Sequence, residues 1–189
     1  MTILIDPGNY SLEVFNFNEL SNLDYILITH AHLDHSDPTF IKKLLEKFPN
    51  VKIITNNSVK EVLVKEGISA MTQGDMNVAL TPVPHEKIWM GPATENTMMT
   101  IFGRLSHPGD SLSMQQTAEI LALPIAGPWC NTTQAVEVGT KLKPKVIIPI
   151  HDWHWKDEVR QGMHQRLKEY FQPLGIDFRP IELGDVIEI

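Results

Sequence analysis

The segment His30–His35 (HAHLDH) places three imidazoles and one carboxylate within six residues, directly after an apolar run, YILIT. Imidazole nitrogens and carboxylate oxygens are the ligands that divalent transition metals take from proteins. Because alternate residues of an extended segment point to the same side, His30 and His32 are expected to bind one ion together. Asp34 and His35 lie past the bend and are expected to face a second ion.

A solvated turn that caps the following helix is the alternative interpretation of this segment. Such turns favour Asn, Ser and Gly rather than three histidines. On this composition, a match to the pattern is expected in fewer than about one chain in a thousand. We therefore favour the metal site over the polar turn.

Histidines also follow other expected strands. Two apolar runs, VALTPVP and VIIPI, end directly before His85 and His151, and Asp110 lies in a Pro-Gly-Asp turn. Ligand sites in α/β proteins gather at the C-terminal ends of strands, so these three residues are further candidate ligands. His107 and His154 lie close by in the sequence and remain alternatives to His85 and His151.

Short apolar runs alternate with segments of helical spacing along the whole chain, which predicts a layered α/β protein with mixed sheets. Helices are expected after the caps Asp37 and Ser58, and over residues 114–121, 132–142 and 157–171. No Gly/Ser-rich linker divides the sequence, so residues 1–189 are predicted to form a single domain.

Composition excludes several classes of protein. A single Cys excludes a disulfide framework or a Cys-rich zinc site. The net charge of −7 argues against nucleic acid and anionic membrane as partners. No apolar run approaches the roughly 20 residues of a membrane-spanning helix, and the first residues do not resemble a signal peptide. We expect a cytoplasmic protein with a small-molecule substrate.

The segment His30–His35, followed in order by His85, Asp110 and His151, resembles the signature of the metallo-β-lactamase fold superfamily. Asp6, at the end of an apolar run in ILIDPG, matches the first motif of that family. The resemblance spans about residues 3–155. It is nearest to the small bacterial metal-dependent hydrolases, which include L-ascorbate-6-phosphate lactonase-like proteins. It implies a four-layer αββα sandwich of two mixed sheets.

The resemblance also implies a ligand set. It assigns three ligands to one ion: His30, His32 and His85. It assigns three to the other: Asp34, His35 and His151. Asp110 would bridge the two ions, and Asp6 would support the ligands from behind. The expected cofactor is two divalent ions, zinc by ligand type, with manganese or iron as alternatives.

Two such ions lower the pKa of bridging water toward about 7 and polarise a carbonyl or phosphoryl group. The predicted function is hydrolysis of a small ester, lactone or phosphoester by a metal-activated hydroxide, with Asp34 and Asp110 as catalytic carboxylates. Asp34 would orient the hydroxide or carry a proton to the leaving group. The alternatives are a phosphodiesterase or nuclease of the same fold, and a non-catalytic metal-binding protein with an incomplete site.

One feature of the family is missing from this sequence. Members usually begin with a β-hairpin before the strand that carries Asp6, and this chain starts at that strand. The first sheet is therefore expected to have an open edge, covered by a homo-oligomer contact or by the C-terminal strands. The segments Trp89–Thr97 and Gly127–Asn131 are expected to line the substrate pocket.

Overall fold

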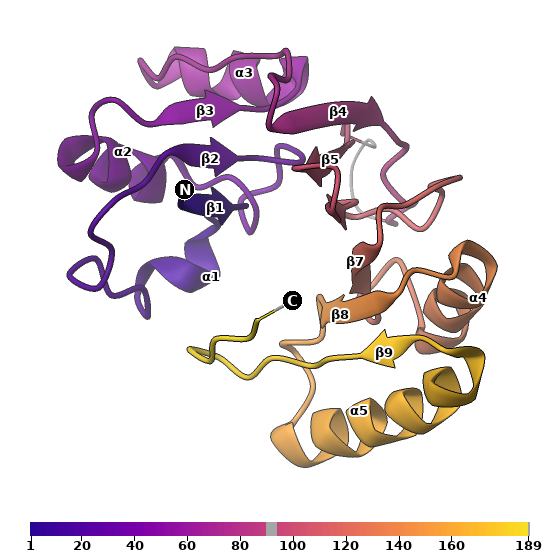
Figure 1. Cartoon of the computed structure of the whole chain (residues 1–189). Helices are drawn as coiled ribbons and strands as arrows, with labels where there is room; N and C mark the ends of the chain where they lie inside the picture. The colour runs from indigo at the N-terminus through magenta and orange to yellow at the C-terminus, as the bar shows by residue number, and fades with distance from the viewer. Residues whose placement is uncertain (90–93, 189) are drawn as a thin grey trace.

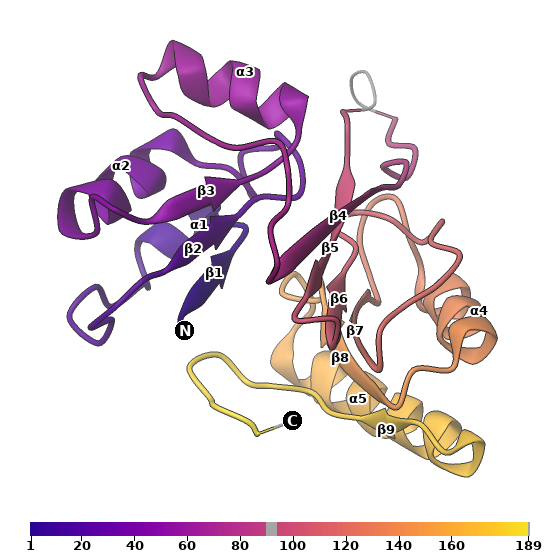
Figure 2. The same cartoon turned by 45° about the horizontal axis from the view of Figure 1, so that its top comes forward.

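Two β-sheets lie at the centre of the molecule, and helices cover their outer faces (Figures 1 and 2). This computed structural model describes residues 1–89 and 94–188. The layers run helix, sheet, sheet, helix, so the expected αββα fold class is confirmed. Within the described part of the chain, no helix is both long and apolar enough to span a membrane.

The smaller sheet has the strand order β1-β2-β3 and is entirely parallel. Its strands are β1 (Ile3–Ile5), β2 (Tyr25–Leu27) and β3 (Lys52–Ile54). The helices of this half are α1 (Asn9–Leu12), α2 (Pro38–Lys47) and α3 (Asn57–Lys65). Among the described residues only β2 pairs with β1, so the outer edge of β1 is open, as predicted.

The larger sheet has six strands in the order β4-β5-β6-β7-β8-β9 and is mixed. The pairs β4–β5 and β5–β6 are antiparallel, and the pairs from β6 to β9 are parallel. Its strands are β4 (Val78–Pro82), β5 (Thr97–Ile101), β6 (Leu105–His107), β7 (Ile120–Pro124), β8 (Val146–Ile150) and β9 (Asp177–Phe178). Its helices are α4 (Thr132–Leu142), α5 (Asp157–Phe171) and the short 3-10 helix η1 (Gln172–Leu174).

The C-terminal strand does not cover the open edge of the small sheet. β9 pairs with β8 at the edge of the larger sheet, so that part of the sequence-based expectation is wrong. β9 adds to the larger sheet beside β8, which is an apolar strand (VIIPI). Both Phe178 and Ile147 are buried there in one cluster with Phe171 of α5.

Side chains of β2 alternate between two apolar cores. Ile26 belongs to a cluster with Phe40 and Leu44 of α2, whereas its neighbour Leu27 belongs to a cluster with Met99 of β5. Successive side chains of a strand point to opposite faces, so β2 is buried by helices on one face and by the second sheet on the other. Burial on both faces explains why this strand is apolar throughout.

Of the two predicted helix caps, Asp37 is confirmed and Ser58 is wrong. Asp37 caps α2 by accepting a hydrogen bond from the Thr39 amide at 2.8 Å. Asn131 caps α4 in a reciprocal capping box with Gln134. At α3, the cap is Asn56, whose side chain accepts from the Val59 amide, and Ser58 lies inside the helix.

The prediction of a helix over residues 114–121 is wrong. The structure has no helix there, and strand β7 begins at Ile120 and pairs in parallel with β6 and β8. A continuous apolar run such as ILALP fits a buried strand as well as a buried helix, so periodicity could not separate them. The Ala118 amide donates to the Ser106 hydroxyl at 2.9 Å instead of entering a helix.

Two glycines in helices should respond oppositely to alanine. Gly139 of α4 is buried, and a β-carbon there would lie 2.9 Å from Phe171 and 3.0 Å from Ile147. Gly162 of α5 is exposed and has open space around it. Overpacking costs about 1–3 kcal/mol, whereas alanine gains about 1 kcal/mol over glycine in a helix. Urea unfolding should show Gly139→Ala as less stable than the parent chain and Gly162→Ala as more stable. A more stable Gly139→Ala variant would contradict this packing.

Candidate metal centre

The predicted site residues follow the C-terminal ends of strands from both sheets. Asp6 comes directly after β1, and His30 comes shortly after β2. In the second sheet, His85 follows β4, Asp110 follows β6, and His151 comes directly after β8. The structure therefore assembles one site from segments that are far apart in the sequence.

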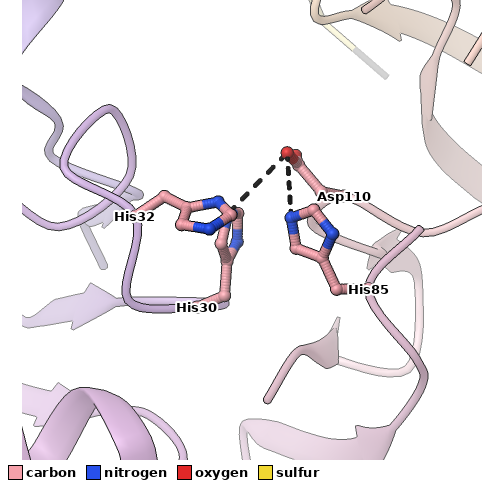
Figure 3. A group of neighbouring side chains, drawn as sticks. All are labelled: His30, His32, His85 and Asp110. Atoms are coloured by element: carbon pink, nitrogen blue, oxygen red, sulfur yellow. Dashed lines mark hydrogen bonds and ion pairs between the residues drawn. The ribbon is translucent and has the colours of Figure 1, made fainter. Parts of the chain in front are cut away.

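The carboxylate of Asp110 lies between two sets of imidazoles. Its Oδ2 is 3.7 Å from Nε2 of His30 and 3.5 Å from Nε2 of His85 (Figure 3). Its Oδ1 is 3.3 Å from Nε2 of His35 and 3.4 Å from Nε2 of His151. Each carboxylate oxygen thus faces its own pair of histidines, as a bridging ligand would.

All seven predicted ligands fall into two groups in which the potential ligand atoms lie within 4.8 Å of one another. The first group consists of His30, His32, His85 and Asp110. The second consists of Asp34, His35 and His151. Within the ranges that the structure describes, neither His107 nor His154 belongs to such a group. The geometry favours His85 and His151 over these two alternatives.

The spacing of these atoms fits metal ligands better than hydrogen-bond partners. Zinc binds nitrogen and oxygen at about 2.0–2.1 Å in a tetrahedron, which puts neighbouring ligand atoms about 3.3–3.4 Å apart. The four contacts of Asp110 range from 3.3 to 3.7 Å. Nε2 of His85 and Oδ1 of Asp110 are buried without a hydrogen-bond partner, which is costly unless each atom faces a cation.

Hydrogen bonds on the far side of two rings define which nitrogen faces the centre. Nδ1 of His85 donates to the carbonyl oxygen of Glu86 at 2.6 Å, and Nδ1 of His151 donates to that of Ala126 at 3.1 Å. A carbonyl only accepts, so Nδ1 carries the hydrogen and Nε2 of the neutral ring holds a lone pair. These lone pairs are directed at Asp110, an arrangement that a cation between the groups would stabilise.

Asp6 supports the ligand loop from behind, in the place that the resemblance implies. Its carboxylate accepts from both the amide and the hydroxyl of Thr29 at 2.7 Å, and from Nδ1 of His35 at 2.8 Å. The Thr29 hydroxyl lies 3.0 Å from Nδ1 of His30. One carboxylate therefore orients two of the histidines that face Asp110.

Comparison with known proteins agrees with this geometry. Residues 1–151 match the family described as the Beta-lactamase superfamily domain. The chain belongs to the beta-lactamase superfamily. This superfamily chain is 30% identical over 182 residues to protein Rv0786c of Mycobacterium tuberculosis, covering 88% of this chain and 83% of the relative.

Two further relatives carry a functional name. UPF0173 metal-dependent hydrolase NEQ378 of Nanoarchaeum equitans is 25% identical over 162 residues, covering 72% of this chain and 73% of that protein. A crystal structure from Parabacteroides distasonis, provisionally named a metal-dependent hydrolase, superposes with a TM-score of 0.67 at 24% identity. That superposition covers 94% of this chain and 83% of the other, and it supports the shared fold.

Burial and neighbouring charges shift the pKa values of His30 and His35 in opposite directions. Burial, together with the charge of His35, lowers the pKa of His30 to about 3. Burial also opposes a charge on His35, but the carboxylates of Asp6 and Asp110 outweigh it and raise that pKa to about 9. Burial opposes the Asp110 charge too, yet the neighbouring imidazoles of His151, His85 and His35 hold the pKa of that carboxyl below its usual range. Asp110 is therefore ionised and His30 neutral, as metal ligands must be, whereas a cation binding at His35 would have to displace a proton from that ring.

A cavity of about 820 Å³ adjoins both ligand groups. Gly127, Pro128 and Trp129 line it, so the expectation for the Gly127–Asn131 segment is confirmed for these three residues. Ile88 also lines it. Of the predicted pocket segment Trp89–Thr97, residues 90–93 lie outside the described part of the structure. Trp89 and residues 94–97 do not line this cavity, so the expectation is wrong for them.

The residue that holds the Asp110 turn, Asn96, is not among the predicted site residues. Asn96 is buried, accepts from the Asp110 amide at 3.2 Å and donates to the Pro108 carbonyl at 2.9 Å. Nothing in its local sequence marks it, because its partners are more than ten residues away. Gly109 completes the turn with φ at +59°, and an added β-carbon would lie 2.3 Å from Oδ1 of Asn96.

Gly109→Ala should therefore destabilise the chain more than Gly103→Ala does. Both glycines have positive φ, at which other residues cost about 1–2 kcal/mol, but only Gly109 is crowded. We expect Gly103→Ala to lower the free energy of unfolding by about 1 kcal/mol and Gly109→Ala by about 3 kcal/mol. Equal losses in denaturant unfolding would mean that the turn does not depend on close contact with Asn96.

Proposed function

We propose that this chain is a dinuclear metal-dependent hydrolase that binds two zinc ions and cleaves a small ester, lactone or phosphoester. The observation that carries the proposal is the carboxylate of Asp110, each oxygen of which faces a separate pair of histidines. The name of the relative from Nanoarchaeum equitans, a metal-dependent hydrolase, supports the same class of activity.

Two divalent ions bound here would lower the pKa of coordinated water and polarise the bond under attack. The protein's part is to keep the two ligand groups at a fixed separation, which Asp110 does by facing both. Asp6 and the two backbone carbonyls hold the imidazole rings in one orientation. Such support commonly contributes 10- to 100-fold, by order of magnitude, to metal affinity or activity.

Asp34 is the candidate ligand best placed to move a proton. It lines the cavity, and its side chain is 34% exposed, against 4% for Asp110. In ester hydrolysis, the water oxygen bonds to the acyl carbon and the acyl C–O bond breaks. One water proton goes to the leaving alkoxide, giving a carboxylic acid and an alcohol. Asp34 is proposed to carry that proton across the cavity.

Metal content tests the ligand assignment. Purified protein loaded with zinc and freed of excess should hold two equivalents by elemental analysis. His30→Ala should hold fewer, and Asp110→Ala fewest, because Asp110 faces both groups. Circular dichroism should show that each variant is folded before its zinc is measured.

The matched control is the neighbouring pair His151 and His154. His151→Ala should lose zinc, and His154→Ala should keep both equivalents, because His154 is exposed and belongs to neither ligand group of the described residues. Equal zinc in the parent chain and in folded Asp110→Ala would refute the dinuclear centre.

Activity is tested with p-nitrophenyl acetate, a γ-lactone and bis-p-nitrophenyl phosphate. We expect hydrolysis of the ester and the lactone, loss of that activity after chelation, and its return with zinc. Asp34→Asn should lower kcat by about 10²-fold at saturating zinc, since proton transfer by a side chain commonly contributes that much. A preference for the phosphodiester would favour a phosphodiesterase or nuclease instead. A zinc-loaded protein inactive on all three would favour a non-catalytic metal-binding protein.

A further inference from the structure

Aromatic and aliphatic side chains surround the mouth of the cavity beside the metal centre. Tyr10, Leu33 and Trp153 all line it, yet they are 59%, 56% and 59% exposed. Large apolar side chains that gather around a concave site commonly mark a surface that binds an apolar ligand. None of these three residues has a role in the proposed hydrolysis.

The two rim aromatics come from opposite halves of the molecule. Tyr10 belongs to α1 beside the smaller sheet, and Trp153 follows β8 of the larger sheet. Their ring centroids are 4.6 Å apart with planes inclined by 38°. The two rings thus meet across the junction of the halves, on the wall of the cavity that adjoins the ligand groups.

Trp129 continues the apolar surface down to the ligands. It is buried, and its ring centroid lies 5.0 Å from that of His151 and 6.1 Å from that of His85. A substrate bound with its reacting group at Asp110 would therefore have aromatic surface beside its remaining atoms. Aromatic surface of this kind is suited to alkyl chains and rings.

The charged residues that line the cavity also favour an uncharged ligand. Within residues 1–89 and 94–188, no Lys or Arg lines it, and its only carboxylates are Asp34 and Asp110. Residues 90–93 (MGPA) carry no charge either. A phosphate or carboxylate placed away from the ions would meet no lysine or arginine among the described lining residues, and His154 is the only lining imidazole outside the ligand groups. Burying a charge without a paired cation is costly.

From these observations we infer that the substrate is an ester or lactone whose non-reacting part is an uncharged alkyl chain or aromatic ring. That part contacts Tyr10, Trp153 and Trp129 while the carbonyl faces Asp110. The inference rests on the proposed hydrolase function and narrows its substrate, setting aside phosphorylated and other anionic compounds.

The test compares p-nitrophenyl esters that share a leaving group and differ in the acyl chain: acetate, hexanoate, and the mono-ester of adipic acid. Hexanoate and adipate have the same chain length, but adipate ends in a carboxylate. We expect kcat/KM for hexanoate to exceed that for the adipate mono-ester by roughly tenfold or more. Tyr10→Ala and Trp153→Ala should each lower kcat/KM for hexanoate by roughly tenfold more than they lower it for acetate, which has no chain to contact them. Tyr10→Phe should retain the preference.

Two controls make the outcome specific. Tyr170→Ala removes an equally large, half-exposed tyrosine on α5 that does not line the cavity, and should change neither substrate. Binding of uncleavable analogues, hexananilide and the mono-anilide of adipic acid, is measured by calorimetry. Hexananilide should bind more tightly, and Trp153→Ala should weaken it selectively.

The possible failures are distinguishable. If acetate is hydrolysed but hexanoate has no advantage over the adipate mono-ester, the substrate inference is overturned and the hydrolase function stands. If no ester is cleaved, the hydrolase function fails. In that case the two anilides still decide whether the cavity selects an uncharged apolar group, and equal binding of both would overturn that selectivity as well.

Discussion

A single buried carboxylate, that of Asp110, ties together the two halves of the site. Buried charge is unfavourable unless it is paired, and here imidazoles from both sheets surround it. The turn that carries it must be tight, which Gly109 allows and Asn96 secures. His85 after β4 then completes one ligand group, and His151 after β8 completes the other. The αββα layering brings the ends of these strands close to the residues that follow β2.

The backbone is strained at two residues of the site. Asp6 and His151 both adopt positive φ, 49° and 68°, directly after β1 and β8. Such conformations cost non-glycine residues about 1–3 kcal/mol and persist where the surroundings over-determine them. For Asp6 those surroundings are its three hydrogen bonds to Thr29 and His35, and for His151 they are the Ala126 carbonyl and the carboxylate of Asp110. Two of the four described non-glycine residues with positive φ therefore lie where the chain leaves a strand beside the centre.

The sequence was most informative where chemistry is encoded locally. Three histidines and an aspartate after one strand indicate a metal site without knowledge of the fold, and their residue types carried the superfamily resemblance. The sequence was least informative where a residue acts through a distant partner. Asn96 and Tyr10 have no local pattern, because their roles arise only when β5 meets the Asp110 turn and when α1 meets the segment after β8. The helix predicted over residues 114–121 is absent for the same reason. The apolar run at its end forms strand β7 because it pairs with β6 and β8, which are distant in the sequence.

Each ligand group combines residues that precede α2 with residues that follow β4. With ions bound as proposed, each ion would close a loop of chain in the way that a disulfide does, although reversibly. A ligand that binds only the folded state stabilises that state by mass action. The lifetime of this chain in a cell would then depend on the supply of divalent ions, and scarcity of the metal would lower the amount of protein as well as its activity.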